Sequence, residues 1–552
     1  MLPGAAVSAP RPDDPGKYPK GYEGPRRPRG PAGTAYERRR PELGTLHRVV
    51  RENLLTLYAA VEEGGSGAAL PAFVRKELEG YVACGLLSRG FALMQCEGCK
   101  QSRLVAFSCK KRGFCPSCCG RRMAQTAANL IDHVLPPVPL RQLVLTMPFE
   151  LRRRLAYDGP LLGAVSRVFV TSVLEWYRRR METEGARDGR SGAVVAIQRC
   201  SSDLRLNPHV HAVLLDGVFT EEADGELSFH PLPRLRTEEL ADVLQIVRVL
   251  ILRLLVRRGV VQGEPDLTVV DDDLAEREPA LAQLASAAVL GQPPAGPALR
   301  RRNPIEIALR GRPGITVASP LSVRELGFSL HAATRAGAED ERAREALIKY
   351  ILRPPVAHER LRILPNDLVR LELKKPWSDG TTAVEMDPLS LLSRLCAAVP
   401  PPRRHTVIYA GVLGAASKLG SRGGLAERVR GPRDCSRIRP APEPPETLPA
   451  PAPLPPLAPL PDPPSPTRRS RYWPWLELLA RTWGIDRGTC ESCGGKMKLH
   501  ALVQDSQSIA RILHHLGEPT EAPTLAAARG PPYWKSRVFR QKPRVQEELF
   551  DT

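Results

Sequence analysis

Hydrophobic side chains recur every three or four positions in some parts of the chain and alternate with polar ones in others. The first pattern covers residues 47–63, 159–184 and 341–353 and predicts helices. Two alternating runs, SGAVVAIQRC and HVHAVLLDGVF, predict neighbouring strands after a strand that becomes a helix near Pro148. Because strand, helix, strand and strand follow one another, the central part of the chain is expected to form a compact α+β domain.

The charge of the chain narrows the choice of partner. Its 552 residues include 80 Lys and Arg against 60 Asp and Glu, a formal net charge of +20. This excess favours a polyanion, and nucleic acid is the first candidate. No apolar run approaches the roughly 18 residues of a membrane span, and no secretory signal pattern is visible. We therefore expect no membrane partner, a location in the bacterial cytoplasm at the nucleoid, and cysteines that bind metal rather than form disulfides.

Two pairs of cysteines have the spacing of a zinc site. Cys96 and Cys99 are followed, after fifteen residues, by Cys115 and Cys118. Two residues between the members of a pair let both sulfurs turn toward one ion, so four thiolates can hold structural Zn2+. Unligated thiols are the alternative. Two further cysteines could replace a ligand, namely Cys109 and Cys119. The basic residues beside the cluster are candidates for DNA phosphate contacts: Lys110, Lys111, Arg112, Arg121 and Arg122.

A His-x-His pair and one tyrosine are candidates for nuclease chemistry. His209 and His211 lie two apart on an expected strand, so both imidazoles leave the same face and could share one divalent ion. Tyr350 lies near the end of a helix, beside Lys349 and Arg353. Cations and a metal ion would stabilise the charge that develops when a tyrosine attacks a phosphodiester. The alternative is two ordinary sheet histidines and a packed tyrosine.

Together these motifs resemble a known family. The segments CEGC with AFSCKKRGFCPSCCGRRM, LNPHVHAVLLDG and IKYILRPPVAHERL are similar to the zinc-binding, metal-binding and catalytic-tyrosine segments of rolling-circle insertion-sequence transposases of the IS ninety-one type, which include the common-region elements. LELKKPWSDGTT, PPPRRHTVIYAGVLG and the tail GTCESCGGKMKLHALVQDSQSIARILHHLG also resemble family segments. The resemblance runs from about His47 to Pro531, and the family belongs to the His-hydrophobic-His (HUH) endonucleases.

The resemblance implies a reaction and its cofactors. Tyr350 would attack single-stranded DNA at the ends of the element and leave a 5′-phosphotyrosine bond and a free 3′-OH that can prime replication. His209 and His211 would hold catalytic Mg2+ or Mn2+, and Gln198 on the neighbouring strand would add a third ligand. Two residues of the connecting loop compete with Gln198, namely Asp203 and Asn207. Because no Walker-type motif occurs, strand separation would fall to a host helicase.

The sequence departs from the family pattern at two positions. Ala346 stands where members with two tyrosines carry the other one, so one nucleophile serves both cleavages or a second protomer of a homo-oligomer contributes another. Ala410 stands where we expect a family histidine, and Tyr409 is therefore left out of the catalytic set. For the extra pair Cys490 and Cys493 no metal is predicted. Residues that could complete a site there are His500, His514, His515 and Cys435.

These observations divide the chain into five expected parts. They are a disordered basic arm at 1–44, a zinc-binding DNA-contact domain at 45–135, a nuclease domain at 136–430 with a helical insertion at about 232–300, a proline-rich linker at 431–468 and a C-terminal accessory module at 469–552. The expected function is that of a transposase. The rivals are a plasmid replication initiator or relaxase of the same superfamily, and a zinc-dependent DNA-binding protein without catalysis.

Overall fold

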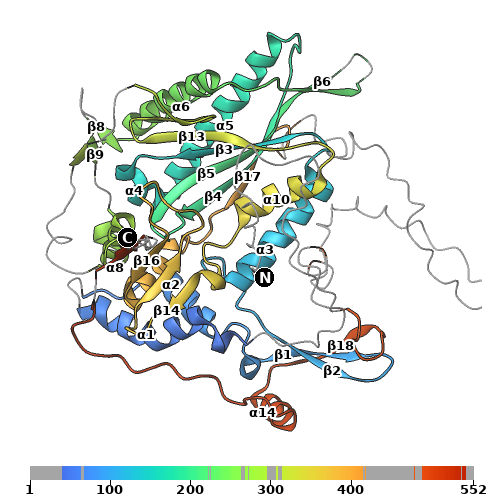
Figure 1. Cartoon of the computed structure of the whole chain (residues 1–552), viewed down its shortest axis with the longest axis vertical. Helices are drawn as coiled ribbons and strands as arrows, with labels where there is room; N and C mark the ends of the chain where they lie inside the picture. The colour runs from blue at the N-terminus through green and yellow to red at the C-terminus, as the bar shows by residue number, and fades with distance from the viewer. Residues whose placement is uncertain are drawn as a thin grey trace, which may run out of the picture.

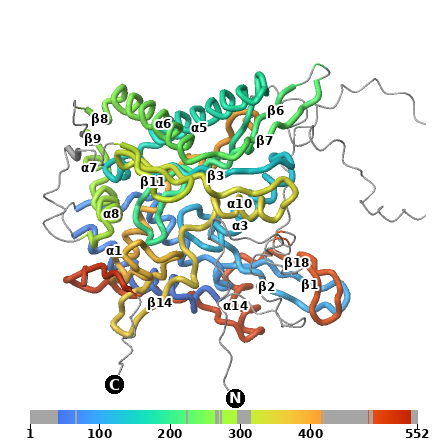
Figure 2. The backbone as a smooth tube through the Cα atoms, turned by 45° about the horizontal axis from the view of Figure 1, so that its top comes forward, coloured from blue at the N-terminus to red at the C-terminus, as the bar shows by residue number. Residues whose placement is uncertain are grey.

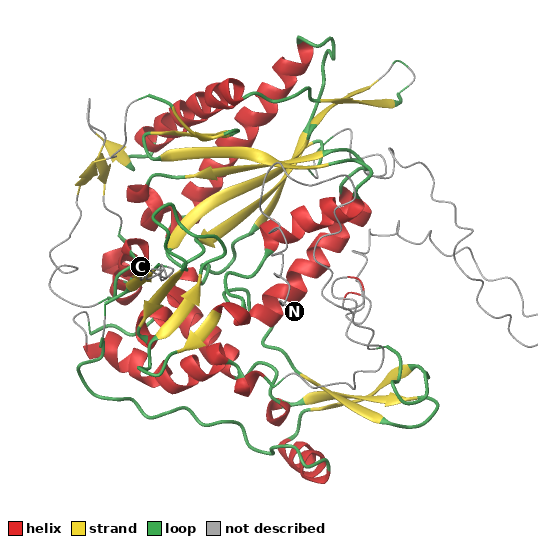
Figure 3. Ribbon diagram, in the orientation of Figure 1, coloured by secondary structure: helices red, strands yellow, loops and turns green. Residues whose placement is uncertain are grey.

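The computed structural model describes residues 40–63, 67–221, 223, 225–262, 268–270, 273–294, 306–308, 314–414, 417, 478, 481, 488–535 and 537–542. Most of the expected basic arm, the whole proline-rich linker and Cys435 lie outside the described residues. The described chain mixes helices with antiparallel sheets, which confirms the predicted α+β class (Figure 3). In these residues no helix is long and apolar enough to cross a lipid bilayer.

A seven-stranded antiparallel sheet forms the centre of the molecule (Figure 1). Its strands, in spatial order, are β11 (Thr316–Ser319), β12 (Ser322–Glu325), β13 (Phe328–Ala336), β3 (Leu140–Thr146), β5 (Leu206–Leu215), β4 (Gly192–Cys200) and β17 (Val407–Gly411). The strands β4 and β5 are the neighbouring pair that the two alternating runs predict. With β3 they place the predicted His-x-His strand in the middle of the sheet, between two hydrogen-bonded neighbours.

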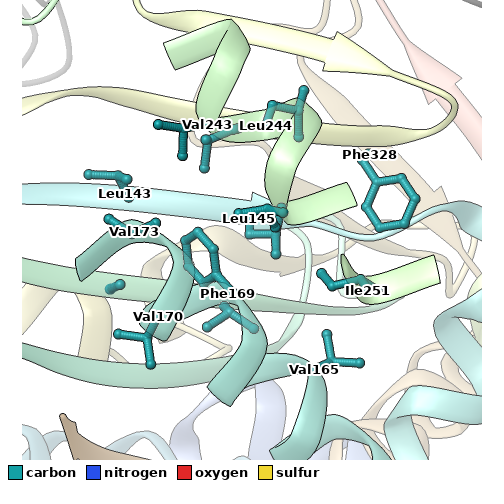
Figure 4. Packing of buried hydrophobic residues seen from close by; sticks show 14 of the residues in the cluster. Leu143, Leu145, Val165, Phe169, Val170, Val173, Val243, Leu244, Ile251 and Phe328 are labelled. Carbon is teal, nitrogen blue, oxygen red and sulfur yellow. The ribbon is translucent and has the colours of Figure 1, made fainter. Parts of the chain in front are cut away.

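Two long helices cover one face of this sheet. They are α5 (Gly159–Glu182) and α6 (Thr237–Arg257). In Figure 4, Phe169 of α5 and Leu244 of α6 pack with Leu145 of β3 in one buried cluster. Val210 of β5 belongs to the same cluster, because every second residue of a strand faces the same side of the sheet. This core covers the face of the sheet that is opposite to the one carrying the two histidines.

The other face is covered by α3 (Pro116–Asn129) and α10 (Glu341–Leu352), which pack on each other. Leu347 and Ile348 of α10 share a buried cluster with Val213 of β5. The helix is therefore held against the face of the sheet from which His209 and His211 emerge. The remaining short elements of this region are η4 (Leu130–Val134), η5 (Phe149–Leu151), α4 (Arg152–Tyr157), β6 (Gly217–Glu221) and β7 (Leu227–Pro231).

The structure corrects the expectation of an inserted helical lobe at about 232–300. The helix α6 is the largest element of that region, and it packs on the central sheet as part of the main core. The apolar stripe of α6 covers a face of the sheet that would otherwise be exposed to water, so the helix packs on the sheet. The other elements of the region are β8 (Val261–Gln262), β9 (Thr268–Val270), α7 (Leu274–Arg277), α8 (Pro279–Leu290) and β10 (Glu306–Ala308).

A second core lies beside the central sheet and joins distant parts of the sequence (Figure 2). Its helices are α1 (Thr45–Val61), α2 (Ala72–Val82), α8 and α11 (Pro388–Ala398), and η1 (Pro41–Leu43) precedes α1. Its four-stranded sheet consists of β14 (Leu361–Ile363), β15 (Val369–Glu372), β16 (Ala383–Met386) and β19 (Phe539–Gln541), and η6 (His358–Arg360) precedes β14. The pairing of β19 with β16 ties the C-terminal segment to this core.

A small three-stranded sheet contains the other C-terminal strand. Its order is β18 (Met497–Val503), β1 (Phe91–Cys96) and β2 (Ser102–Ala106), and η3 (Leu87–Arg89) and α14 (Ser506–His515) complete its core. The sequence predicts a separate accessory module for the C-terminal residues. Instead their described part adds β18 to an N-terminal hairpin and β19 to β16, because each edge strand offers unpaired backbone groups.

Candidate functional site: a histidine pair, a tyrosine and two cysteine clusters

The two histidines lie side by side on β5. Their ring centroids are 4.8 Å apart, and both rings emerge on the face of the sheet that carries α10. Val210 between them points into the opposite core, as the sequence pattern predicts. Pro208 and the neighbours on β3 and β4 keep the segment extended. Two imidazoles at this spacing can act on one small group or ion placed between them.

Both histidines are held in the neutral form. Burial lowers the pKa of His209 to about 4, and burial together with the neighbouring His209 holds the pKa of His211 well below its ordinary value. Neutral imidazoles are the form that binds metal ions. The same arrangement disfavours a cationic histidine at this place.

The hydrogen bonds of the pair define which ring atoms remain available. His209 donates from Nδ1 to the backbone oxygen of Asn207 at 2.7 Å, which leaves its Nε2 free to act as an acceptor. His211 Nδ1 lies 2.6 Å from the side-chain amide of Gln142. Nε2 of His211 and Oδ1 of Asn207 are buried without a hydrogen-bond partner in the described structure. Such orphaned polar atoms are costly unless a ligand satisfies them.

Tyr350 lies against this pair. The helix α10 begins at the side chain of Asp340, which accepts a hydrogen bond from the backbone of Ala343, and it ends before Pro354. Its last turn carries Tyr350, whose ring centroid lies 6.1 Å from that of His211. The tyrosine is 40% exposed, so the residue is partly accessible to solvent. The guanidinium of Arg353 stacks on the tyrosine ring at 4.1 Å.

Gln198 connects the histidine strand to the tyrosine helix. It lies directly opposite His209 in the register of β4 and β5, on the neighbouring strand where the sequence places it. Its amide nitrogen donates to the backbone oxygens of Tyr350 at 3.2 Å and Ile351 at 2.9 Å. The side-chain nitrogen is therefore used, and the oxygen is the atom left for another partner. The competitor Asp203 is occupied by a salt bridge to Arg205 at 2.5 Å.

A basic cleft adjoins this site. It is partly open to solvent, and Gln198 belongs to its wall. Its cationic lining comes from the cysteine-rich region, from β4 and from the segment after α10, and consists of Arg112, Arg122, Arg199, Arg353, Arg360 and Lys374. Of the five basic residues singled out in the sequence, Arg112 and Arg122 line the cleft. The other three, which are Lys110, Lys111 and Arg121, do not.

The structure corrects the expected grouping of the cysteines. Cys115 and Cys118 form a cluster with Cys84 and Cys109, and all four sulfurs lie within 4.8 Å of one another. Cys84 follows α2 and has no C-x2-C partner, so no pattern in the sequence marks it as a ligand. The spacing makes Cys109 only a substitute ligand, whereas the structure places it in the cluster. The cluster is largely buried, and its thiol pairs approach to 3.4 to 3.7 Å, as tetrahedral ligation of one zinc ion requires.

The pair Cys96 and Cys99 belongs to a different cluster. These two cysteines lie with Cys490 and Cys493, again with all four sulfurs within 4.8 Å. The single four-cysteine site predicted from Cys96, Cys99, Cys115 and Cys118 is therefore divided between two places. The spacing could not reveal this, because the first pair lies at the turn of the β1–β2 hairpin, and β2 then leads the chain to the other end of the hairpin before Cys115.

The structure also shows where the two residues that depart from the family pattern lie, namely Ala346 and Ala410. Ala346 lies on α10 one turn before Tyr350, on the same side of the helix. Ala410 pairs with Ala193 on β4, and this register puts it on the face of the sheet opposite to the histidine pair. A histidine at position 410 would face the main hydrophobic core. Tyr409 lies on the histidine face and is 39% exposed.

The comparisons with known proteins agree with these parts. A family model described as "Transposase zinc-binding domain" matches residues 56–147, and one described as "Putative transposase" matches residues 192–419. The first contains the cluster of Cys84 to Cys118, and the second contains the histidine pair and Tyr350. No curated protein and no solved structure matches the chain. Because both models match, the chain belongs to the IS ninety-one family of transposases, which carry a structural zinc-binding domain and act on DNA.

Proposed function

We propose that this transposase cuts and rejoins single-stranded DNA at the ends of an insertion sequence through a covalent bond to Tyr350. The observation that carries the proposal is the 6.1 Å separation between the rings of Tyr350 and His211, with the exposed tyrosine beside a basic cleft. Two distant segments of the sequence thus bring a nucleophile to a pair of metal-ligand side chains.

The residues around the histidine pair fit a divalent cation. His209 and His211 would hold it through Nε2, and the orphaned Nε2 of His211 supports this assignment. For Nε2 to be a ligand, the Nδ1 proton of His211 must be accepted by the oxygen of Gln142, which a rotation of that amide provides. Bound Mg2+ or Mn2+ would polarise the scissile phosphate.

A third ligand would come from an oxygen on the same face. Gln198 keeps its amide oxygen for this purpose, since its nitrogen is bound to the end of α10. Asn207 is the competitor, because its Oδ1 is buried without a partner two positions before His209 on the same strand. Asp203 is excluded by its salt bridge to Arg205.

The proposed chemistry is a transesterification. The hydroxyl oxygen of Tyr350 attacks phosphorus and loses its proton to solvent, a tyrosine–phosphate bond forms, and the bond from phosphorus to the 3′-oxygen breaks. The 3′-oxygen takes up a proton and leaves as a hydroxyl that can prime replication. Attack of a 3′-OH on the phosphotyrosine reverses the step and joins strands. Arg353, stacked on the tyrosine ring, would stabilise the negative charge of the phosphate in the transition state.

The DNA strand would enter along the basic cleft. Arg112 and Arg122 come from the zinc-binding domain and Arg353 from the tyrosine helix, so both domains would contact one backbone. The rolling-circle pathway, a host helicase that opens the duplex and a homo-oligomer that contributes a second tyrosine complete the proposal. A location at the nucleoid in the bacterial cytoplasm follows from the same DNA substrate.

The test is formation of a covalent adduct. Purified protein is mixed with labelled single-stranded DNA from the element's ends, with Mn2+ or with EDTA, and separated on a denaturing gel. Wild type should form a Mn2+-dependent adduct, Tyr350→Phe should form none, and Tyr409→Phe should behave as wild type. Tyr409 is the matched control because it is exposed to the same extent on the same face of the sheet. If wild type binds the DNA without any adduct, the protein is a DNA-binding protein only.

A further inference from the structure

Two segments from opposite ends of the sequence meet at the second cysteine cluster. Cys96 is the last residue of β1 and Cys99 follows it, and Cys490 and Cys493 precede β18. The sulfurs of Cys96 and Cys493 are 3.4 Å apart, and those of Cys99 and Cys490 are 3.6 Å apart. Four sulfurs at about 2.3 Å from a tetrahedral zinc ion lie about 3.8 Å from one another. A disulfide would bring two sulfurs to about 2.05 Å.

The backbone around these cysteines is built as two interlocked turns. The residue after the second cysteine of each pair has a left-handed conformation, with φ of 61° at Lys100 and 71° at Gly494. Glu97 donates its backbone N–H to the oxygen of Lys496 at 3.0 Å, which joins the two turns. A Cβ at Gly495 would lie 2.9 Å from the sulfur of Cys96, so this position needs glycine.

Two salt bridges cross the junction between the turns. Lys498 forms a salt bridge with Glu97, and Arg103 forms one with Glu491 at 3.4 Å. Each of these pairs joins the N-terminal segment to the C-terminal one, as the cysteine cluster does.

We propose that Cys96, Cys99, Cys490 and Cys493 hold a second structural zinc ion that fastens the C-terminal segment to the zinc-binding domain. The matched family domain ends at residue 147, so half of this ligand set lies outside it. Cys96 and Cys493 are 397 residues apart in the chain, and Cys99 and Cys490 are 391 residues apart. Closing so long a loop costs chain entropy, and metal ligation offsets that cost in the folded state.

The zinc ion would also hold together a sheet that neither segment forms alone. Without β18, β1 and β2 are an isolated hairpin, and such two-stranded units are marginal in water. The small core of this sheet takes Phe91 and Leu104 from the N-terminal segment and Val503, Ile509 and Leu513 from the C-terminal one. Loss of the second zinc should therefore loosen the hairpin of the zinc-binding domain as well as the tail.

The two clusters differ in accessibility, which allows them to be distinguished. Cys99 and Cys493 are exposed, whereas Cys84, Cys115 and Cys118 are buried. A chelator should therefore reach the second zinc before the first. Elemental mass spectrometry should find two zinc ions per chain in the full-length protein. The double variant Cys490→Ser/Cys493→Ser should contain one, and Cys119→Ser should keep two, since Cys119 belongs to neither cluster.

One zinc ion per wild-type chain, or two in the double variant, would overturn the proposal. Because the double variant could fail to fold, a second measurement uses wild type. Hydrogen exchange is recorded before and after a chelator has removed the first of the two zinc ions. The amides of β1 and β18 should exchange faster together, while those of α1 keep their protection. Unchanged exchange in β18 after loss of that zinc would equally refute the assignment.

Discussion

Replacing Gln142 tests how the histidine pair is oriented for metal. Gln142 lies on β3, is 2% exposed, and places its side-chain amide 2.6 Å from Nδ1 of His211. Gln142→Leu removes the amide and keeps a side chain of similar volume. Without an acceptor for its Nδ1 proton, His211 is no longer held in the tautomer that presents Nε2 as a ligand.

The size of the effect follows from this geometry. Loss of a partner that orients a metal-bound histidine typically weakens metal binding by roughly 10- to 100-fold, or about 1.4 to 2.7 kcal/mol. Water cannot replace the amide, because the site is buried. Gln142→Glu keeps an oxygen acceptor at the same place and should retain most of the affinity. Gln283 lies on the distant helix α8, and Gln283→Leu is the matched control, since it loses an amide hydrogen bond to the backbone oxygen of Pro294.

The assay is Mn2+ binding by calorimetry, followed by the adduct assay across a range of Mn2+ concentrations. Gln142→Leu should require roughly 10- to 100-fold more Mn2+ and approach the wild-type rate when saturated. A positioning role predicts this rescue, whereas a general loss of structure does not. If Gln142→Leu binds Mn2+ within twofold of wild type, or if saturating Mn2+ restores nothing, Gln142 does not orient a ligand.

Three other properties can be tested independently. In EDTA, the melting temperature should fall as the pH drops from 7 to 5. Burial lowers the pKa of His209 to about 4 and holds that of His211 well below its ordinary value, so the unfolded chain binds protons near pH 6.5 that the folded chain does not. His209→Gln/His211→Gln should flatten this slope, and an unchanged slope would contradict the assignment. Asp216→Ala should cost about 3 to 5 kcal/mol in denaturant unfolding, because it leaves Arg141 buried without its partner at 2.7 Å. The exposed pair of Asp273 and Arg277 is its control, with a change below about 1 kcal/mol on Asp273→Ala. Arg353→Leu should slow adduct formation by on the order of a hundredfold at saturating Mn2+, and Arg353→Lys should slow it less; equal rates for all three proteins would show that the cation is not used.

The elements next to the histidines could be predicted from the sequence because their patterns are local. Alternation in the two runs predicts which residues of β4 and β5 share a face of the sheet, and in the structure Gln198 lies opposite His209 on one of these faces. The helix that carries Tyr350 is likewise visible in its apolar spacing. What lies across the sheet is not local: Gln142 on β3 comes about 70 residues before His211, and nothing in its own segment marks it as a partner.

The cysteines show the same limit more sharply. A C-x2-C pair predicts a metal-binding turn, but it does not say which second pair closes the tetrahedron. Cys96 and Cys99 lie fifteen residues before Cys115, yet their partners are Cys490 and Cys493. The β1–β2 hairpin carries the nearer pair away, while the pairing of β18 with β1 brings the distant pair close. The pairing of the strands, and not distance along the sequence, therefore determines which cysteines share a cluster.

A single tyrosine on α10 limits how the proposed reaction can proceed. Ala346, one turn before Tyr350, has no nucleophilic atom, so α10 offers one attacking group to the histidine pair. After the first cleavage that group is held in a phosphotyrosine bond until a 3′-OH attacks it. Cleavage and joining must therefore alternate within one protomer. Two strands can be held at once only if a second copy of the chain contributes its own Tyr350, which makes the number of protomers at the DNA part of the mechanism.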